Sequence, residues 1–289
     1  MFSRVLLTCV LCALLSLASA RKSHIGNASL DIESQTLNFP YPYEFPELQN
    51  GSSMDNGLFP MPLCRGFKLE EASIDQLQQA MSNGTLTSVQ IVFCYLKRVY
   101  QTDEYIRYLY PRCLTIQIAN KIRSVMEINP DLLEIAEALD FERSRGHVRG
   151  PLHGIPFLVK DNIGTKDKME TTAGSWMLLG SVIPRDAHVV HLLREAGAIL
   201  MGHATLSEWA DMRSNIYSEG YSARGGQARS PYNLTTNPGG SSSGSGAAVS
   251  ANLVPFSLGT ETDGSVINPA ERNALVGIKP TVGLTSRAG

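Results

Sequence analysis

Two residues and one loop of this sequence have types and surroundings that could support acyl-transfer chemistry. Lys160 ends an apolar, strand-like segment at residues 155–159, and Ser265 ends the polar loop Gly259-Thr-Glu-Thr-Asp-Gly-Ser265. Between them, residues 237–246 form a Gly/Ser-rich stretch with several hydroxyls. A serine hydroxyl is a poor nucleophile until a base takes its proton. Because burial disfavours the ammonium form, Lys160 can act as that base, with a hydroxyl of the Gly/Ser stretch relaying the proton from Ser265.

The Gly/Ser stretch has three other interpretations. Its composition is typical of a flexible linker, but it runs directly into apolar segments and not into an independent unit. Its glycines could surround a phosphate, yet a nucleotide loop is expected to contain Gly-Lys-Ser/Thr, and residues 237–268 contain no lysine. Finally, Gly240-Ser-Ser-Ser-Gly244 fits the G-x-S-x-G elbow of esterases, with Ser242 as nucleophile. An elbow needs a preceding buried strand, whereas residues 231–238 are polar and turn-like.

The spacing of apolar residues predicts the elements that must position these groups. Helices are predicted from Ser73 to the stop at Asn83-Gly84, from a cap at Thr87 or Ser88 to about residue 99, and over 132–143, 188–196 and 247–253. Strands are predicted at 114–118, 155–159, 198–201 and 254–258. A helix followed by Ala-Gly-Ala and a buried strand is typical of a sheet with crossover helices. The predicted fold class is therefore α/β.

Several motifs, taken in order, resemble one family. Leu152-His-Gly-Ile-Pro-Phe-Leu-Val-Lys-Asp-Asn-Ile163 is similar to the lysine segment of amidase-signature enzymes. Gly239-Gly-Ser-Ser-Ser-Gly-Ser-Gly-Ala247 and Leu258-Gly-Thr-Glu-Thr-Asp-Gly-Ser265 are similar to the signature itself. Residues 171–175, 196–203, 206–209 and 277–281 resemble further family segments. The likeness runs from about residue 70 to the last residue, and its motif order is more specific than any single pattern.

The resemblance implies a central twisted mixed sheet flanked by helices, in an amidase-signature domain over residues 70–289. It also implies a Ser–cis-Ser–Lys triad, in which Ser265 is the nucleophile, Ser241 is the relay after a cis peptide bond and Lys160 is the base. Ser242 would support this network. The oxyanion hole would consist of the backbone N–H groups of Thr262, Asp263, Gly264 and Ser265. Gly264 would leave room for the substrate carbonyl.

Neighbouring residues could serve the triad or the fold. Asp161 and Asn162 follow the base, and either orient it or tie down its loop. His153 and His203 lie beside strand-like segments and are expected to make structural hydrogen bonds. The form Asp263-Gly-Ser265, where many members have Gly-Gly-Ser, resembles the branch that includes bacterial peptide amidases.

The implied activity is hydrolysis of a non-peptide or terminal carboxamide C–N bond through an acyl-enzyme on Ser265, without a metal or organic cofactor. The substrate would be a small-molecule or peptide amide, and no obligate partner is implied. Transamidation within the family normally needs partner subunits, and a secretory signal argues against that activity. Family chains usually continue beyond Gly289, so we expect the fold to be incomplete at the C-terminus, a fragment. A catalytically silent secreted product is therefore the alternative from another class.

Composition and the N-terminus indicate a secreted globular protein. The 289 residues are 43% hydrophobic and 18% charged, with a net charge of −2 that argues against nucleic-acid binding. Residues 1–20 place Arg4 before an apolar run that ends at Ala18-Ser-Ala20, which predicts a signal peptide cleaved near Ala20 and no membrane attachment afterwards. Residues 21–69 are expected to form an irregular arm.

Sequons and cysteines agree with the secretory route. The sequons, which predict a glycoprotein, begin at Asn27, Asn50, Asn83 and Asn233. Without the signal segment the chain keeps Cys64, Cys94 and Cys113, an odd number that allows at most one intramolecular disulfide.

Overall fold

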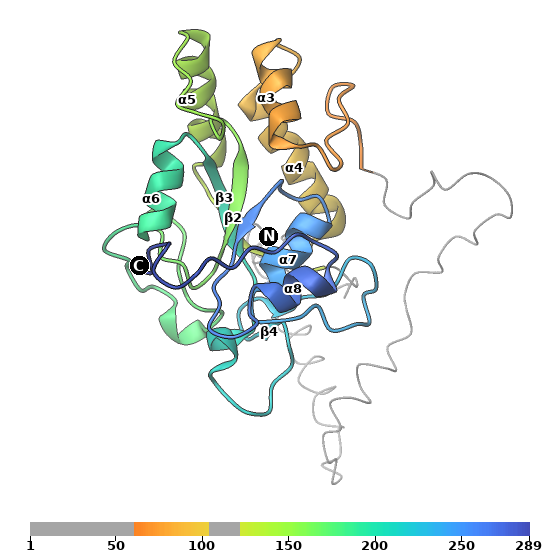
Figure 1. Cartoon of the computed structure of the whole chain (residues 1–289), viewed down its shortest axis with the longest axis vertical. Helices are drawn as coiled ribbons and strands as arrows, with labels where there is room; N and C mark the ends of the chain where they lie inside the picture. Colours follow the sequence, from red (N-terminus) through yellow and green to blue (C-terminus); the bar gives the residue numbers. More distant parts are fainter. Residues whose placement is uncertain (1–60, 104–121) are drawn as a thin grey trace, which may run out of the picture. The chain divides into compact units, whose positions relative to one another are not determined.

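The computed structural model describes residues 61–103 and 122–289, and the statements below refer to these (Figure 1). The predicted signal segment, most of the N-terminal arm and the strand predicted at 114–118 lie outside the described residues. Residues 61–69 of the arm are irregular apart from one bridge between Cys64 and Phe67. No helix in the described part of the chain is both long and apolar enough to cross a membrane.

The elements follow one another as an α/β pattern. The α-helices are α3 (Ile74–Ser82), α4 (Ser88–Thr102), α5 (Leu132–Ser144), α6 (His188–Glu195), α7 (Ser243–Ser250) and α8 (Ile267–Arg272). The strands of the main sheet are β1 (Val125–Ile128), β2 (Pro156–Lys160), β3 (Ile199–Ala204) and β6 (Ser257–Leu258). A separate pair is formed by β4 (Tyr221–Ser222) and β5 (Gly226–Gln227), and two 3-10 turns are η1 (Trp176–Leu178) and η2 (Glu208–Asp211).

The main sheet is mixed and has the order β1-β3-β2-β6. β1 runs antiparallel to β3, whereas β2 runs parallel to both β3 and β6. The last residue of β2, Lys160, pairs with the last residue of β3, Ala204. The loops that follow three parallel strands therefore meet at one edge of the sheet.

Two hydrophobic clusters cover the two faces of the sheet, and the alternation of side chains along each strand separates them. Leu158 of β2 belongs to the cluster that includes α3, α4, α5 and α7, while Phe157 and Val159 belong to the cluster that includes α6. All five residues of β2 are buried. Figure 1 shows α6 and α7 on opposite sides of β2 and β3. The predicted α/β class with a central mixed sheet flanked by helices is confirmed.

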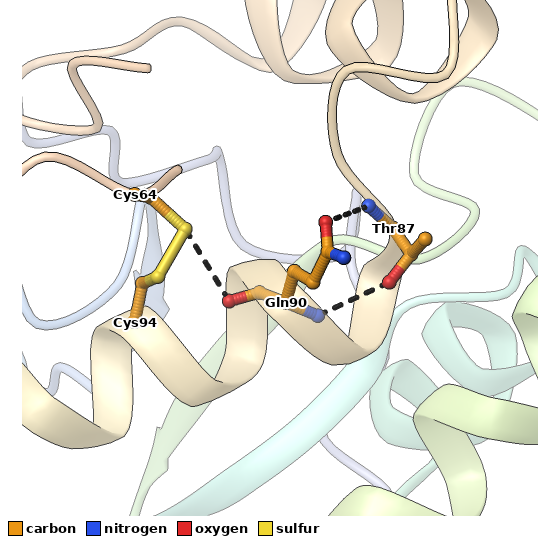
Figure 2. The surroundings of a disulfide bond; sticks show 4 residues. All are labelled: Cys64, Thr87, Gln90 and Cys94. Carbon is orange, nitrogen blue, oxygen red and sulfur yellow. Dashed lines mark hydrogen bonds between the residues drawn. A yellow bond between two sulfur atoms is a disulfide. The ribbon is translucent and has the colours of Figure 1, made fainter. Parts of the chain in front are cut away.

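Capping boxes start the first two helices. At α4, the Thr87 hydroxyl accepts a hydrogen bond from the backbone N–H of Gln90, and the Gln90 side chain accepts one from the N–H of Thr87 (Figure 2). Ser73 and Gln76 make the same pair of bonds at α3. This arrangement satisfies two backbone donors at each helix start. Both helices were predicted, and Thr87 is the cap of the second.

A disulfide joins the start of the described chain to α4 (Figure 2). Cys64 bonds to Cys94, which lies 30 residues further along the chain. Cys113 lies outside the described residues. The expectation of at most one intramolecular disulfide is consistent with this pairing.

Predictions around the Gly/Ser stretch were displaced. The helix predicted at 247–253 begins earlier, at Ser243, and the strand predicted at 254–258 covers only Ser257–Leu258. Glycine and serine have low helix propensity, so the sequence pattern starts the helix too late. A side chain at Gly244 would lie 2.5 Å from the Thr205 carbonyl oxygen. The helix therefore begins where glycine lets it abut the ends of the strands, and tertiary packing overrides propensity.

Candidate active site

Lys160 is fully buried at the carboxyl end of β2, with no part of its surface exposed. Its ammonium Nζ donates to the hydroxyl of Ser241 at 2.7 Å and to the carbonyl of Thr260 at 3.1 Å. Burial lowers the pKa of Lys160 from 10.5 to about 7, although the charges of Asp211 and Glu261 act in the opposite direction. Near neutral pH a large fraction of the amine is therefore uncharged and able to accept a proton.

The Gly/Ser stretch forms a buried wall beside this lysine. Residues 238–248 are all buried, which is incompatible with a flexible linker. The peptide bond between Gly240 and Ser241 is cis, as the family resemblance implied. The carbonyl of Ser241 accepts a hydrogen bond from the N–H of Ser207 at 3.0 Å, and the N–H of Gly240 donates to the side chain of Asn268 at 3.3 Å. The backbone is thus held on both sides of the Ser241 hydroxyl.

Ser242 is tied to the strand loop and not to a base. Its hydroxyl donates to the Thr260 carbonyl at 3.2 Å and accepts from the Thr260 N–H at 3.3 Å. Residues 228–242 contain no strand, so the strand–turn–helix geometry of a nucleophile elbow is absent there. Ser242 holds the same residue whose carbonyl binds Lys160, which is the supporting position expected for it.

Ser265 lies at the end of the second polar loop, immediately before α8. Its carbonyl accepts a hydrogen bond from the Ser242 N–H at 3.1 Å. Its side chain is partly exposed, and its hydroxyl makes no hydrogen bond with any other described residue. The structure thus joins Lys160 to Ser241 directly and places the backbone of Ser265 beside that of Ser242, while the Ser265 hydroxyl remains available.

The loop before Ser265 presents backbone donors. The N–H groups of Thr262, Asp263 and Ser265 donate to no other described residue. The N–H of Gly264 instead faces Glu261: burial raises the pKa of that carboxyl, but the N–H groups of Ile267, Val266 and Gly264 together hold it below its usual value. Of the predicted oxyanion donors, Gly264 is therefore the one already engaged within the loop.

Gly264 has a second reason to be glycine besides access for a carbonyl. Its φ is +84°, in the left-handed region, and a side chain added there would meet no protein atom within 4 Å. The space beside it is open, as the access argument required, and the backbone conformation itself disfavours any residue with a Cβ.

Asp161 ties down a loop behind the base. One carboxylate oxygen accepts from the Thr172 hydroxyl at 2.6 Å and from the Gly174 N–H at 3.0 Å, and the other lies 2.7 Å from Nδ1 of His203. Asn162 donates to the Thr260 hydroxyl at 3.0 Å. Asp161 therefore anchors residues 172–174, while Asn162 steadies the residue that binds Lys160.

The structural contacts predicted for two histidines are present. His203 completes its second ring nitrogen with the Thr165 hydroxyl at 2.9 Å, and His153 lies 3.0 Å from the Leu139 carbonyl. Within the described residues, no three His, Cys, Asp or Glu side chains gather as metal ligands.

The sheet edge explains why these residues meet. Lys160 ends β2, Ser207 follows β3 and Thr260 follows β6, so the carboxyl ends of three parallel strands converge on the Ser241 hydroxyl. Ligand sites of open α/β sheets lie at this edge. Sequence reasoning missed Ser207 as a neighbour of the site. Its position directly after a predicted buried strand is the signal that could have found it.

With fold and site described, the chain can be assigned to a class: it belongs to the amidase family, whose family model matches residues 104–289. The Schizosaccharomyces pombe protein named "Putative amidase C869.01" is 58% identical over 258 residues, which cover 89% of this chain and 40% of that protein. The solved peptide amidase of Stenotrophomonas maltophilia is 46% identical with a TM-score of 0.69, and the match covers 76% of this chain and 42% of that one.

A third relative is named for a different activity. The glutamyl-tRNA(Gln) amidotransferase of Symbiobacterium thermophilum contains a polypeptide that is 48% identical over 159 residues, or 55% of this chain and 31% of that polypeptide. The chain thus spans less than half the length of each of these relatives.

Proposed function

We propose that this chain carries the catalytic triad of a serine amidohydrolase, with Ser265 as nucleophile, Ser241 as relay and Lys160 as base. The observation that carries the proposal is the 2.7 Å hydrogen bond between Lys160 and the Ser241 hydroxyl in a fully buried setting. Burial brings the pKa of Lys160 to about 7, which suits a base that must take up and return a proton near neutral pH.

The reaction follows from this arrangement. Neutral Lys160 accepts the proton of Ser241 while Ser241 accepts the proton of Ser265, whose oxygen then bonds to the amide carbon. The resulting oxyanion is bound by the backbone N–H groups of Thr262, Asp263 and Ser265. When the C–N bond breaks, the proton returns from Lys160 through Ser241 to the leaving nitrogen. Water, activated by the same relay, then hydrolyses the ester on Ser265 and regenerates the free hydroxyl.

The substrate is proposed to be a small-molecule or peptide amide whose leaving group is ammonia or an amine. Similarity to a peptide amidase supports this choice. No further protein is assigned to the reaction.

Secretion and glycosylation are proposed with it, on the signal segment predicted from residues 1–20. Two sequons fall on described residues, and both asparagines are exposed. In each, the threonine hydroxyl donates to the asparagine side chain, at 2.6 Å between Thr85 and Asn83 and at 2.7 Å between Thr235 and Asn233. Exposed turns of this kind are accessible to a glycosyltransferase.

A fluorophosphonate probe tests the triad, because it reacts covalently with activated serines. We expect the chain to be labelled, Ser265→Ala to abolish labelling, and Lys160→Met to abolish it as well. Ser242→Ala should be labelled more slowly, since it loses only the bonds to Thr260. Labelling that persists in Ser265→Ala but is lost in Ser242→Ala would favour an esterase-type site. Absence of labelling in the unmodified, folded chain would contradict the proposal for this chain and favour a silent product.

A further inference from the structure

A left-handed turn lies next to the base and is unusual in sequence. Trp209, Ala210 and Asp211 have φ values of 56°, 54° and 69°, and none of them is glycine. Non-glycine residues rarely adopt this conformation singly, and three in succession are rarer still. Backbone strain of this kind persists where the surroundings fix it and often marks a functional position. The turn begins at a hydrogen bond from the Trp209 N–H to the Ala173 carbonyl, at 3.0 Å.

The turn brings the carboxyl group of Asp211 back towards Ser207, the residue that holds the relay. Ser207 is 1% exposed, its N–H donates to the Ser241 carbonyl at 3.0 Å, and its hydroxyl accepts from the Gly220 N–H at 2.9 Å. A side chain at Gly240 would lie 2.7 Å from the same hydroxyl. Ser207 therefore fills the space between Asp211 and the Gly240–Ser241 peptide.

The electrostatics connect Asp211 to the base itself. Burial raises the pKa of Asp211, while a hydrogen bond with Ser207 and the charge of Lys160 lower it. One of its oxygens, Oδ1, is buried without a hydrogen-bond partner among the described residues. Conversely, Asp211 is the largest of the charges that oppose the desolvation of Lys160, with Glu261 second. The interaction between the two residues is thus present from both sides.

Other charged groups face this region and must be distinguished from Asp211. Glu261, on the loop after β6, faces Lys160 and is held by backbone N–H groups at the start of α8. Glu219 faces Asp211 and is attracted by Arg272, and Tyr217 faces Asp211 and Glu219. Of the two carboxylates that act on Lys160, Asp211 is the one placed by the left-handed turn.

We propose that Asp211 is a positioning residue for the Lys160–Ser241 pair, an inference that rests on the proposed amidase function. The left-handed turn holds its carboxylate where it opposes the desolvation of Lys160, and Ser207 links it to the backbone of the relay. Asp211 therefore keeps the base from being neutral far below the working pH, and so retains its ability to hold a proton for the leaving nitrogen.

The test is to remove the charge and keep the shape. Asparagine tolerates the left-handed conformation, so Asp211→Asn should fold with the same turn. The ionisation of Lys160 is followed by NMR of ¹³Cε-labelled lysine, with the resonance assigned through Lys160→Met. We expect its midpoint, about 7 in the unmodified chain, to fall in Asp211→Asn by about half a pH unit or more.

The matched control is Glu219→Gln, which removes a neighbouring carboxylate that faces Asp211 and is not among the charges acting on Lys160. We expect this variant to leave the Lys160 midpoint in place or to raise it slightly, because Asp211 ionises more readily without a like charge beside it. An unchanged midpoint in Asp211→Asn, or an equal fall in both variants, would overturn the inference.

Failure of this inference and failure of the proposed function are separable. The NMR titration does not depend on any reaction at Ser265, whereas fluorophosphonate labelling does. If Asp211→Asn shifts the acid limb of the labelling rate to lower pH together with the Lys160 midpoint, both stand. Labelling without any shift would overturn the role of Asp211 alone. A shift in a chain that is never labelled would support that role and contradict the proposed function.

Discussion

The desolvation of Lys160 makes a prediction about stability that does not depend on activity. The pKa of this lysine is about 7 in the folded chain, against 10.5 for a solvated lysine. Between these two values the unfolded chain binds one proton that the folded chain does not. Stability must therefore rise with pH across this window, by at most about 1.4 kcal/mol per pH unit. From about pH 7.5 to 9.5 the contribution of Lys160 amounts to roughly 2 to 3 kcal/mol.

Lys160→Met isolates this contribution because methionine has a similar length and no charge. The free energy of unfolding is measured by urea denaturation, followed by circular dichroism, at intervals across that pH range. We expect the unmodified chain to gain stability relative to Lys160→Met by roughly 2 to 3 kcal/mol as the pH rises. Other titrating groups contribute equally to both proteins and cancel in the difference.

The absolute stability of Lys160→Met is a poorer measure than its pH dependence, because the substitution also leaves the Ser241 hydroxyl without its donor. Lys68→Met serves as the control, since the Lys68 side chain is 70% exposed and stays in water in both states. It should keep the pH dependence of the unmodified chain. Parallel curves for Lys160→Met and the unmodified chain would refute the reasoning, because a base in a desolvated site must produce a slope.

Three further substitutions test the frame of the site. Gly239→Ala should lower the free energy of unfolding by more than about 2 kcal/mol in urea denaturation, because φ is +77° and the added carbon would lie 2.8 Å from the backbone of Pro269. Gly264→Ala meets open space at a φ of +84°, so its stability loss should be only about 1 kcal/mol while fluorophosphonate labelling falls sharply. Cys64→Ser opens the loop of 30 residues closed by Cys94 and should lower the unfolding free energy by about 3 to 4 kcal/mol. A larger stability loss in Gly264→Ala than in Gly239→Ala, or no loss in Cys64→Ser, would contradict these assignments.

The elements with strong local signals could be predicted from the sequence. α3 and α4 have Ser73 and Thr87 as caps, with glutamine three residues later, and the apolar spacing behind them places the buried stripe of each helix. β2 could be predicted because it is buried on both faces and therefore reads as a continuous apolar run. Lys160 became a candidate by the same argument, since a cation at the end of such a run must be desolvated.

Other elements depend on contacts that no local pattern records. β1 has only four residues and no alternation, and it exists because it pairs with β3. The start of α7 is set by the close approach of Gly244 to the strand ends, against the propensities of glycine and serine. Asp211 reaches Lys160 only through a left-handed turn, and nothing in Trp209-Ala-Asp211 predicts that conformation. The missed features are thus the ones fixed by tertiary structure.

The location of Lys160 joins stability and function through one physical term. Desolvation at the end of β2 makes the folded chain less stable at neutral pH than a neutral residue there would, and the same desolvation supplies an amine that can accept a proton at that pH. A fully neutral lysine would be of little use as an acid in the second half of the reaction, so a counter-charge is needed that does not solvate the site. Asp211 meets this need because the turn holds it as a fixed, partly buried charge beside Ser207. A flexible, solvated carboxylate in its place would bring water to Lys160 and return its pKa towards 10.5. On this argument, the strained turn at Trp209–Asp211 and the buried end of β2 are two parts of one device for setting the proton affinity of the base.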